Sequence, residues 1–125
     1  MTIGYQAYQV NSVQTASPEQ LVVMLYDGCL RFLRRAEAAA RDDRPPQVTN
    51  GISRATAIIM ELNATLDMER GGEIAKNLRS LYLFLHRHLL EASRERDPEK
   101  IAQAIRLVAD LRDAFAQAAK RVQAA

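Results

Sequence analysis

The chain has 125 residues, of which 48% are hydrophobic and 26% are charged, and its formal net charge is +2. This length predicts a single domain that buries its own core. Lys and Arg alternate with Asp and Glu along the chain instead of gathering in one stripe, which argues against nucleic-acid binding. Few Gly and Pro, no Trp, and abundant Ala, Leu and Arg favour a helical protein.

The only cysteine, Cys29, lies inside an apolar run and has no intramolecular disulfide partner. We interpret it as a small buried apolar residue in a protein of a reducing compartment. The N-terminus lacks the charged and apolar regions of a signal peptide, and no apolar run reaches the ~20 residues of a membrane span. We therefore expect a cytoplasmic (cytosolic) protein without membrane insertion.

Residues 1–16 form a polar arm rich in Gln, Asn, Ser and Thr. Tyr5 and Tyr8 are three positions apart, so one helical turn would place both rings on the same side. Composition leaves two interpretations open. The arm is either an unstructured terminus with incidental tyrosines or a segment that docks its rings into a groove.

The segment Ser17-Pro18-Glu19-Gln20 predicts the start of a helix. Ser17 can cap the free backbone amides of the first turn, Pro18 fits the first helical position and Gln20 completes a capping box. We predict a helix over residues 18–41. Its first three turns are apolar around well over half of the circumference, more than one core contact needs. Two stripes run along it: Val22, Tyr26, Cys29, Leu33, Ala36 and Ala40, and Leu21, Leu25, Gly28 and Phe32.

The Pro45-Pro46 linker breaks the chain before a second predicted helix, residues 46–67. Its predicted core seam has heptad-like spacing and comprises Val48, Ile52, Ala55, Ile59, Leu62 and Leu66. Gly71 or Gly72 can adopt the left-handed conformation that ends a helix. The connection is short, so the flanking helices should be antiparallel neighbours.

The third predicted helix covers residues 72–94. Its predicted seam contains Ile74, Leu78, Leu81, Leu85 and His88, with Tyr82 and Leu89 beside it. Residues 81–85 are apolar on every side, and Leu83 and Leu90 point nearly opposite to the seam. Such a segment is either buried on two sides or exposed for a partner.

The fourth helix begins at Asp97-Pro98-Glu99, another capped start, and runs to the C-terminus. Its predicted seam is narrow and comprises Ile101, Ala104, Val108, Leu111, Phe115, Ala118 and Val122. Four helices with short links predict an all-α, antiparallel up-down four-helix bundle. We assign it to one domain over 1–125, with the arm at 1–16 and the bundle at 17–123.

The residues of a catalytic or metal site are not apparent. His86 and His88 are two apart and cannot share a helix face, and no Glu-x-x-His pair of a di-iron bundle occurs. Gly71-Gly72 lacks the following Lys and Ser or Thr of a phosphate loop. We expect neither enzyme activity nor a cofactor, and no metal.

Three separated segments carry a family resemblance: YQAY at 5–8, ASPEQLVVMLYDG at 16–28 and LDMERGGEIAKNL at 66–78. Together with Leu81-Tyr82 and Asp97-Pro98-Glu99, they resemble the flagellar secretion chaperone FliS family over nearly the whole chain. The resemblance implies a bacterial cytoplasmic chaperone that holds the C-terminal segment of flagellin unpolymerised for the flagellar type III export apparatus. Other flagellar regulatory or export proteins are further candidate partners.

The resemblance also implies where the client binds. Members of the family are helical bundles around which flagellin wraps as short helices in apolar grooves, and their N-terminal arm covers part of that surface. The Pro45-Pro46 linker and the Arg- and Ala-rich helices depart from many members. On these grounds we predict that flagellin contacts Tyr5, Tyr8, Leu21, Met24, Leu25, Tyr82, Leu83 and Leu90.

Two other interpretations of the surplus apolar surface remain. It could join two copies in a homodimer, so a monomer and a weak homodimer both stay open. Nucleic-acid binding, the other alternative, would require an affinity that falls steeply with salt.

Overall fold

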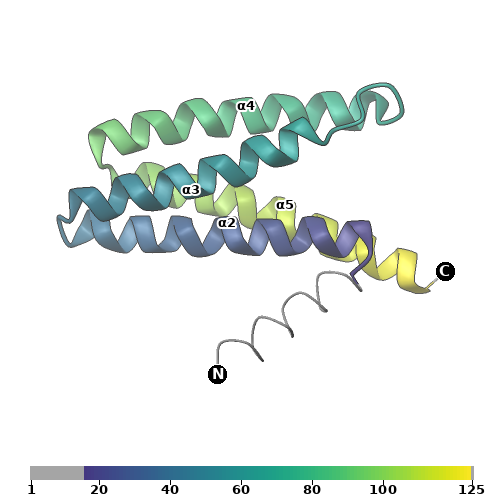
Figure 1. Ribbon diagram of the computed structural model, residues 1–125, viewed down its shortest axis with the longest axis horizontal. Helices are drawn as coiled ribbons and strands as arrows, with labels where there is room; N and C mark the ends of the chain where they lie inside the picture. The colour runs from purple at the N-terminus through teal and green to yellow at the C-terminus, as the bar shows by residue number, and fades with distance from the viewer. Residues whose placement is uncertain (1–15, 125) are drawn as a thin grey trace, which may run out of the picture.

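The computed structural model describes residues 16–124, and within this range the chain forms four antiparallel helices arranged as an up-down bundle (Figure 1). The helices are α2 (Pro18–Arg41), α3 (Pro45–Ala64), α4 (Gly72–Glu95) and α5 (Pro98–Ala124). α2 packs against α3 and α5, and α4 packs against the same two helices. The helices therefore form a ring in which α2 and α4 lie on a diagonal. The predicted all-α bundle is confirmed.

Both capped helix starts are confirmed. Backbone N of Gln20 donates to Oγ of Ser17 at 3.2 Å, and backbone N of Ser17 donates to Oε1 of Gln20 at 2.8 Å. At the start of α5, Oδ1 of Asp97 accepts a hydrogen bond from backbone N of Glu99 at 2.9 Å. These bonds satisfy amides that the first turn of a helix leaves free.

The connection between α3 and α4 differs from the prediction. α3 ends at Ala64, three residues before the predicted end. In the turn that follows, Oδ1 of Asp67 accepts hydrogen bonds from the amides of Glu69 and Arg70. Gly72 does adopt a left-handed φ of 53°, but it begins α4 instead of ending α3.

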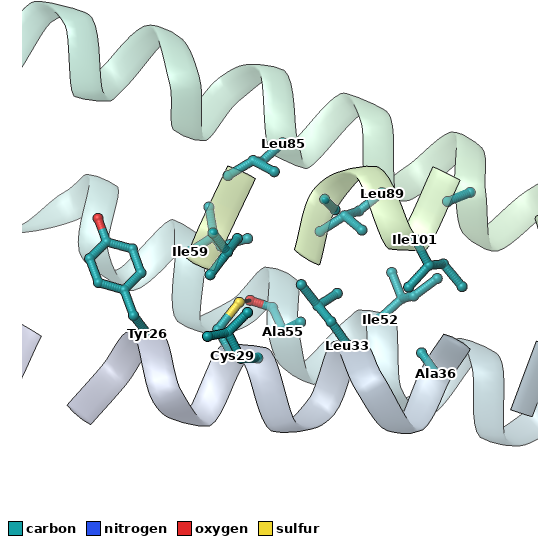
Figure 2. Close-up of a cluster of buried hydrophobic side chains, with 14 of the residues drawn as sticks. Tyr26, Cys29, Leu33, Ala36, Ile52, Ala55, Ile59, Leu85, Leu89 and Ile101 are labelled. Carbon is teal, nitrogen blue, oxygen red and sulfur yellow. Dashed lines mark hydrogen bonds between the residues drawn. The ribbon is translucent and has the colours of Figure 1, made fainter. Parts of the chain in front are cut away.

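The core lies between all four helices. Of the two stripes predicted on α2, the one through Tyr26, Cys29 and Leu33 faces the core. The predicted seam of α3 is confirmed from Val48 to Leu62, whereas Leu66 lies beyond the end of α3 and is only partly buried. Figure 2 shows Tyr26, Cys29, Leu33 and Ala36 of α2 facing Ile52, Ala55 and Ile59 of α3, with Leu85, Leu89 and Ile101 closing the cluster. In α5 the fully buried positions are Ile101, Ala104 and Val108. Leu111 and Phe115, which we predicted in the same seam, are only partly buried.

Gly51 sets the distance between α2 and α3. A Cβ atom on Gly51 would lie 2.8 Å from the carbonyl O of Phe32 and 2.9 Å from Cβ of Ala36. Both separations are shorter than van der Waals contact, so only glycine allows the two backbones to approach this closely.

The predicted seam of α4 is confirmed at Leu85 and wrong at Ile74, and Tyr82 and Leu89, predicted beside the seam, are buried. Ile74, predicted to be buried, is 73% exposed, and the buried residues are Ala75, Tyr82, Leu85, Leu89 and Ala92. His88 lies at the rim, where Nε2 donates to the carbonyl O of Lys100 at 2.9 Å. Residues 81–85 are apolar on every side, so the sequence of this part of α4 did not identify a unique core face.

The N-terminal turns of α4 and the C-terminal turns of α5 diverge (Figure 1). The bundle is therefore open at the end where α3 leads into α4. This divergence explains why Ile74, Leu111 and Phe115 are less buried than their seam positions predicted.

Candidate protein-binding surface

A hollow of about 280 Å³ lies at the open end of the bundle, where α4 and α5 diverge. We call it the apolar hollow because aliphatic and aromatic side chains make up most of its lining. The lining residues are Val22, Leu62, Thr65, Leu66, Asp67, Gly71, Ile74, Ala75, Leu78, Tyr82 and Phe115. Asp67 is the only charged residue among them.

Two buried tyrosines and a phenylalanine lie beneath the apolar hollow. The hydroxyl groups of Tyr26 and Tyr82 form a hydrogen bond across the diagonal between α2 and α4. The ring centroid of Phe115 lies 5.5 Å from that of Tyr26. Each buried hydroxyl thereby has a partner within the protein, so the base of the hollow carries no unsatisfied polar group at this point.

Burial also fixes the charge state of this region. Burial raises the pKa of Tyr26, and the bond to the Tyr82 hydroxyl raises it further; burial likewise raises the pKa of Tyr82. Desolvation disfavours the phenolate, so both side chains are neutral at physiological pH. The base of the apolar hollow is therefore uncharged and suited to aliphatic or aromatic side chains.

Several large apolar side chains are exposed around the bundle. On α2, Met24 is 38% and Leu25 is 37% exposed; on α4, Ile74 is 73%, Phe84 is 47% and Leu90 is 57% exposed. Ile74 belongs to the lining of the apolar hollow. Exposed apolar side chains of this size, grouped on two helices, are typical of surfaces that bind a protein partner.

The residues predicted to contact a client lie in three kinds of place. Met24, Leu25 and Leu90 are exposed, Leu21 and Leu83 are partly buried, and Tyr82 is buried at the hollow. Tyr5 and Tyr8 lie outside the described residues.

α2 and α4 each pack chiefly against α3 and α5. The predicted client residues on α2 are therefore not brought next to those on α4. Of the six described residues in that prediction, only Tyr82 lines the apolar hollow.

Ile74, Val22 and Phe115 also line the apolar hollow but were not predicted to bind a client. Their spacing places them in the predicted apolar seams and stripes, which indicates core positions. A useful signal was available for Ile74. It lies two residues after Gly72, in the first turn of α4, where an apolar side chain has few neighbours to cover it.

Cys29 lies in the core and not at the surface. Its Sγ lies 3.7 Å from the carbonyl O of Ala55, and burial raises the pKa of the thiol to about 12. A thiol in this environment is inert because only the thiolate is a good nucleophile.

Neither a metal centre nor a membrane span is found in residues 16–124. No three His, Cys, Asp or Glu side chains there are placed to hold a metal ion. None of the helices in that range is long and apolar enough to cross a membrane.

A helical bundle whose described residues leave an apolar hollow open, and which exposes apolar side chains on two helices, has the features of a protein-binding module. The sequence profile of the family described as "Flagellar protein FliS" matches residues 1–122. The chain belongs to this family of flagellar secretion chaperones.

Individual relatives agree with that assignment. The chain is 40% identical to the flagellar secretion chaperone FliS of Bacillus subtilis, over 91% of this chain and 84% of the relative. It is 38% identical to that of Campylobacter jejuni, over 90% of this chain and 88% of the relative. The chaperone of Salmonella typhimurium is 37% identical, over 91% of this chain and 88% of the relative.

Proposed function

We propose that this chaperone binds the C-terminal segment of flagellin in the cytosol, keeps it from polymerising and delivers it to the flagellar export apparatus. The observation that carries the proposal is the apolar hollow with its uncharged base and the exposed Ile74 at its edge. A segment that assembles into a filament must offer apolar side chains, and an apolar, neutral hollow is complementary to them.

The remaining exposed apolar side chains support a client that wraps around the bundle. Met24 and Leu25 on α2 and Leu90 on α4 are too far apart in the ring to belong to the apolar hollow, which none of them lines. A segment that folds as it binds typically buries about 1,000–3,000 Å², enough to cross several helices. The exposed side chains would then be successive anchors of one client.

Calorimetric titration of the full chain with a peptide from the C-terminal region of the same bacterium's flagellin tests the proposal. We expect an affinity in the micromolar range or tighter, with a negative heat-capacity change from apolar burial. The same chain, added at equal concentration to purified flagellin, should suppress filament growth in a turbidity assay. Absence of binding at micromolar concentration would refute the proposal.

Variants separate the two surfaces. Ile74→Ser and Leu90→Ser should each lower client affinity because they remove exposed apolar contacts at the hollow and on the outer face of α4. Arg106→Ser on the exposed face of α5 is the matched control and should leave affinity unchanged. If only Leu90→Ser weakens binding, the client does not use the apolar hollow and that part of the proposal is wrong.

The arm has its own test. Tyr5→Ala combined with Tyr8→Ala should change client affinity while barely changing the melting temperature, because the predicted role of the arm is to contact the client and not to build the bundle. Unchanged affinity would indicate that the arm is an unstructured terminus whose tyrosines do not contact the client.

A further inference from the structure

A second, larger hollow lies at the opposite end of α2 from the apolar hollow. It measures about 590 Å³ and lies between the C-terminal half of α2 and the first turns of α3. Its lining includes Phe32, Arg35, Arg44, Gln47, Asn50 and Gly51, with Asp42 as the only acidic member. We call it the basic hollow. Neither the predicted client residues nor the exposed apolar side chains of α4 belong to it.

Two arginines, Arg35 in the lining of the basic hollow and Arg54 beside it, lie over the ring of Phe32. The guanidinium carbon of Arg35 is 5.8 Å, and that of Arg54 is 5.7 Å, from the ring centroid of Phe32. The attraction between a cation and the face of a ring holds each guanidinium in place while leaving its N–H groups available. Phe32 itself is positioned by Gly51, whose close approach brings α3 against the backbone of Phe32.

These arginines have no acidic partner in the described part of the chain. The ion pairs found within residues 16–124 engage Arg41, Arg70, Lys76, Lys100 and Arg112, and none engages Arg35, Arg44 or Arg54. Other arginines of this range, such as Arg34 and Arg106, are also outside these ion pairs, but Arg35 and Arg54 in addition lie over the ring of Phe32. The lining of the basic hollow combines Arg35 and Arg44, neither of them in an ion pair within residues 16–124, with the partly buried ring of Phe32 and the apolar Ala38 and Ala39. Arg54 lies beside the hollow, over the same ring.

We propose that the basic hollow docks an acidic segment of a second protein partner. The carboxylates of this acidic segment pair with Arg35 and Arg54. An apolar side chain of the segment, between two of its carboxylates, packs against Phe32. Arginine suits this role because its planar fork of donors binds a carboxylate through two parallel hydrogen bonds. Charge complementarity also disfavours the chain's own arm as the occupant, since residues 1–15 contain no Asp or Glu.

A protein segment fits the basic hollow better than a phosphate-rich polymer. A polyanion would be attracted to the arginines, but it would also meet Asp42 and the apolar Ala38 and Ala39 in the lining. An acidic amphipathic helix offers both chemistries at once, because residues three and four apart share a face. This docking does not depend on flagellin binding, so failure of either proposal leaves the other unaffected.

The test uses the full-length chain and a synthetic amphipathic helix of about 15 residues with Glu and Leu on one face, long enough to form in the bound state. Its twin carries Lys in place of every Glu. In a titration followed by nuclear magnetic resonance, the acidic peptide should shift the signals of Phe32, Arg35 and Arg54, and the twin should not. Shifts at Met24, Leu83 and Leu90 instead would overturn the proposal.

Charge reversal supplies the matched comparison. The double variant R35E/R54E should weaken binding of the acidic peptide by about tenfold or more, because two direct charge pairs are replaced by repulsion. The control R34E/R106E reverses the same number of charges at exposed positions outside the basic hollow. Equal losses in both variants would show non-specific attraction and overturn the proposal.

Two further measurements complete the test. Phe32→Leu keeps an apolar side chain but removes the ring on which the guanidinium groups lie, so it should weaken peptide binding by about threefold or more. Duplex RNA of similar charge should compete poorly; tighter binding of RNA than of the peptide would overturn the proposal. Sedimentation measures the oligomeric state as well. If the wild-type chain is a dimer that does not bind the peptide and R35E/R54E is a monomer, the basic hollow joins two copies of this chain and the proposal is overturned.

Discussion

The apolar hollow and the basic hollow lie at opposite ends of the same helix pair and have opposite chemistry. The apolar hollow has one acidic residue, Asp67, in an otherwise aliphatic and aromatic lining, and its base is a neutral pair of tyrosines. The basic hollow is lined by Arg35, Arg44 and the ring of Phe32, over which Arg54 also lies, and its lining contains no tyrosine. One bundle thus presents two surfaces that should select different partners.

Their origins differ as well. The apolar hollow exists because α4 and α5 diverge, which leaves core-type residues such as Phe115 and Leu78 only partly covered. The basic hollow exists where α2 and α3 approach most closely, at Gly51, and where Phe32 and its arginines are held outside the contact. Incomplete packing generates an apolar surface, whereas tight packing displaces long charged side chains toward solvent, where they remain free to bind.

The largest effect should come from the core that both hollows share. Leu33→Ala removes a fully buried side chain at the centre of the bundle and should lower the free energy of unfolding by ~2–5 kcal/mol. Urea denaturation measures it, with Leu90→Ala, at an exposed position, as the control that should cost far less. Equal costs would mean that the buried cluster of Figure 2 is not the stabilising core.

A smaller effect should fall on the basic hollow alone. Gly51→Ala forces a Cβ against the backbone of Phe32 and should lower the free energy of unfolding by ~1–3 kcal/mol. It should also weaken binding of the acidic peptide while leaving flagellin binding intact. Gly28→Ala is the matched control: its Cβ meets its nearest neighbours at 3.5 and 3.6 Å, which is ordinary contact, so it should not destabilise.

Alkaline pH should act on the core near the apolar hollow. Burial raises the pKa of Cys29 from 9.0 to about 12 and raises that of Tyr26, so the folded chain keeps protons that the unfolded chain loses. This contribution to stability is complete below pH 9 and is lost as the pH rises toward 12, by about 1.4 kcal/mol per pH unit for each such group.

Urea denaturation at a series of alkaline pH values measures this loss, and Cys29→Ala should reduce its slope. A stability that stays constant above pH 9 would contradict the burial of both groups.

The smallest change in stability should come from the edge of the apolar hollow. Ile74→Ser alters a side chain that is 73% exposed and should change the free energy of unfolding by less than about 0.5 kcal/mol. Its effect on client affinity, measured by calorimetry, should nevertheless exceed that of R35E/R54E. The reverse order would mean that the client prefers the basic hollow and that the two surfaces are not separate in function.

The sequence by itself determined the parts of this protein that depend on neighbouring residues. Ser17 and Asp97 identified two helix starts because capping is a local hydrogen-bond pattern. The heptad-like seam through Ile59 identified the core face of α3, whereas α2 carried two candidate stripes, of which the one through Cys29 is buried. The motifs at 5–8, 16–28 and 66–78 likewise sufficed to predict the family that the profile match then showed.

Only the tertiary structure decided which face of α4 is buried and where the two hollows lie. The sequence predicted Ile74 in the core, but packing against α3 and α5 buries Ala75 and leaves Ile74 73% exposed. The bond between Tyr26 and Tyr82 joins residues 56 positions apart. Arg54 reaches Phe32 only because Gly51 lets two helices meet. Each depends on distances between helices, which spacing along one helix does not specify.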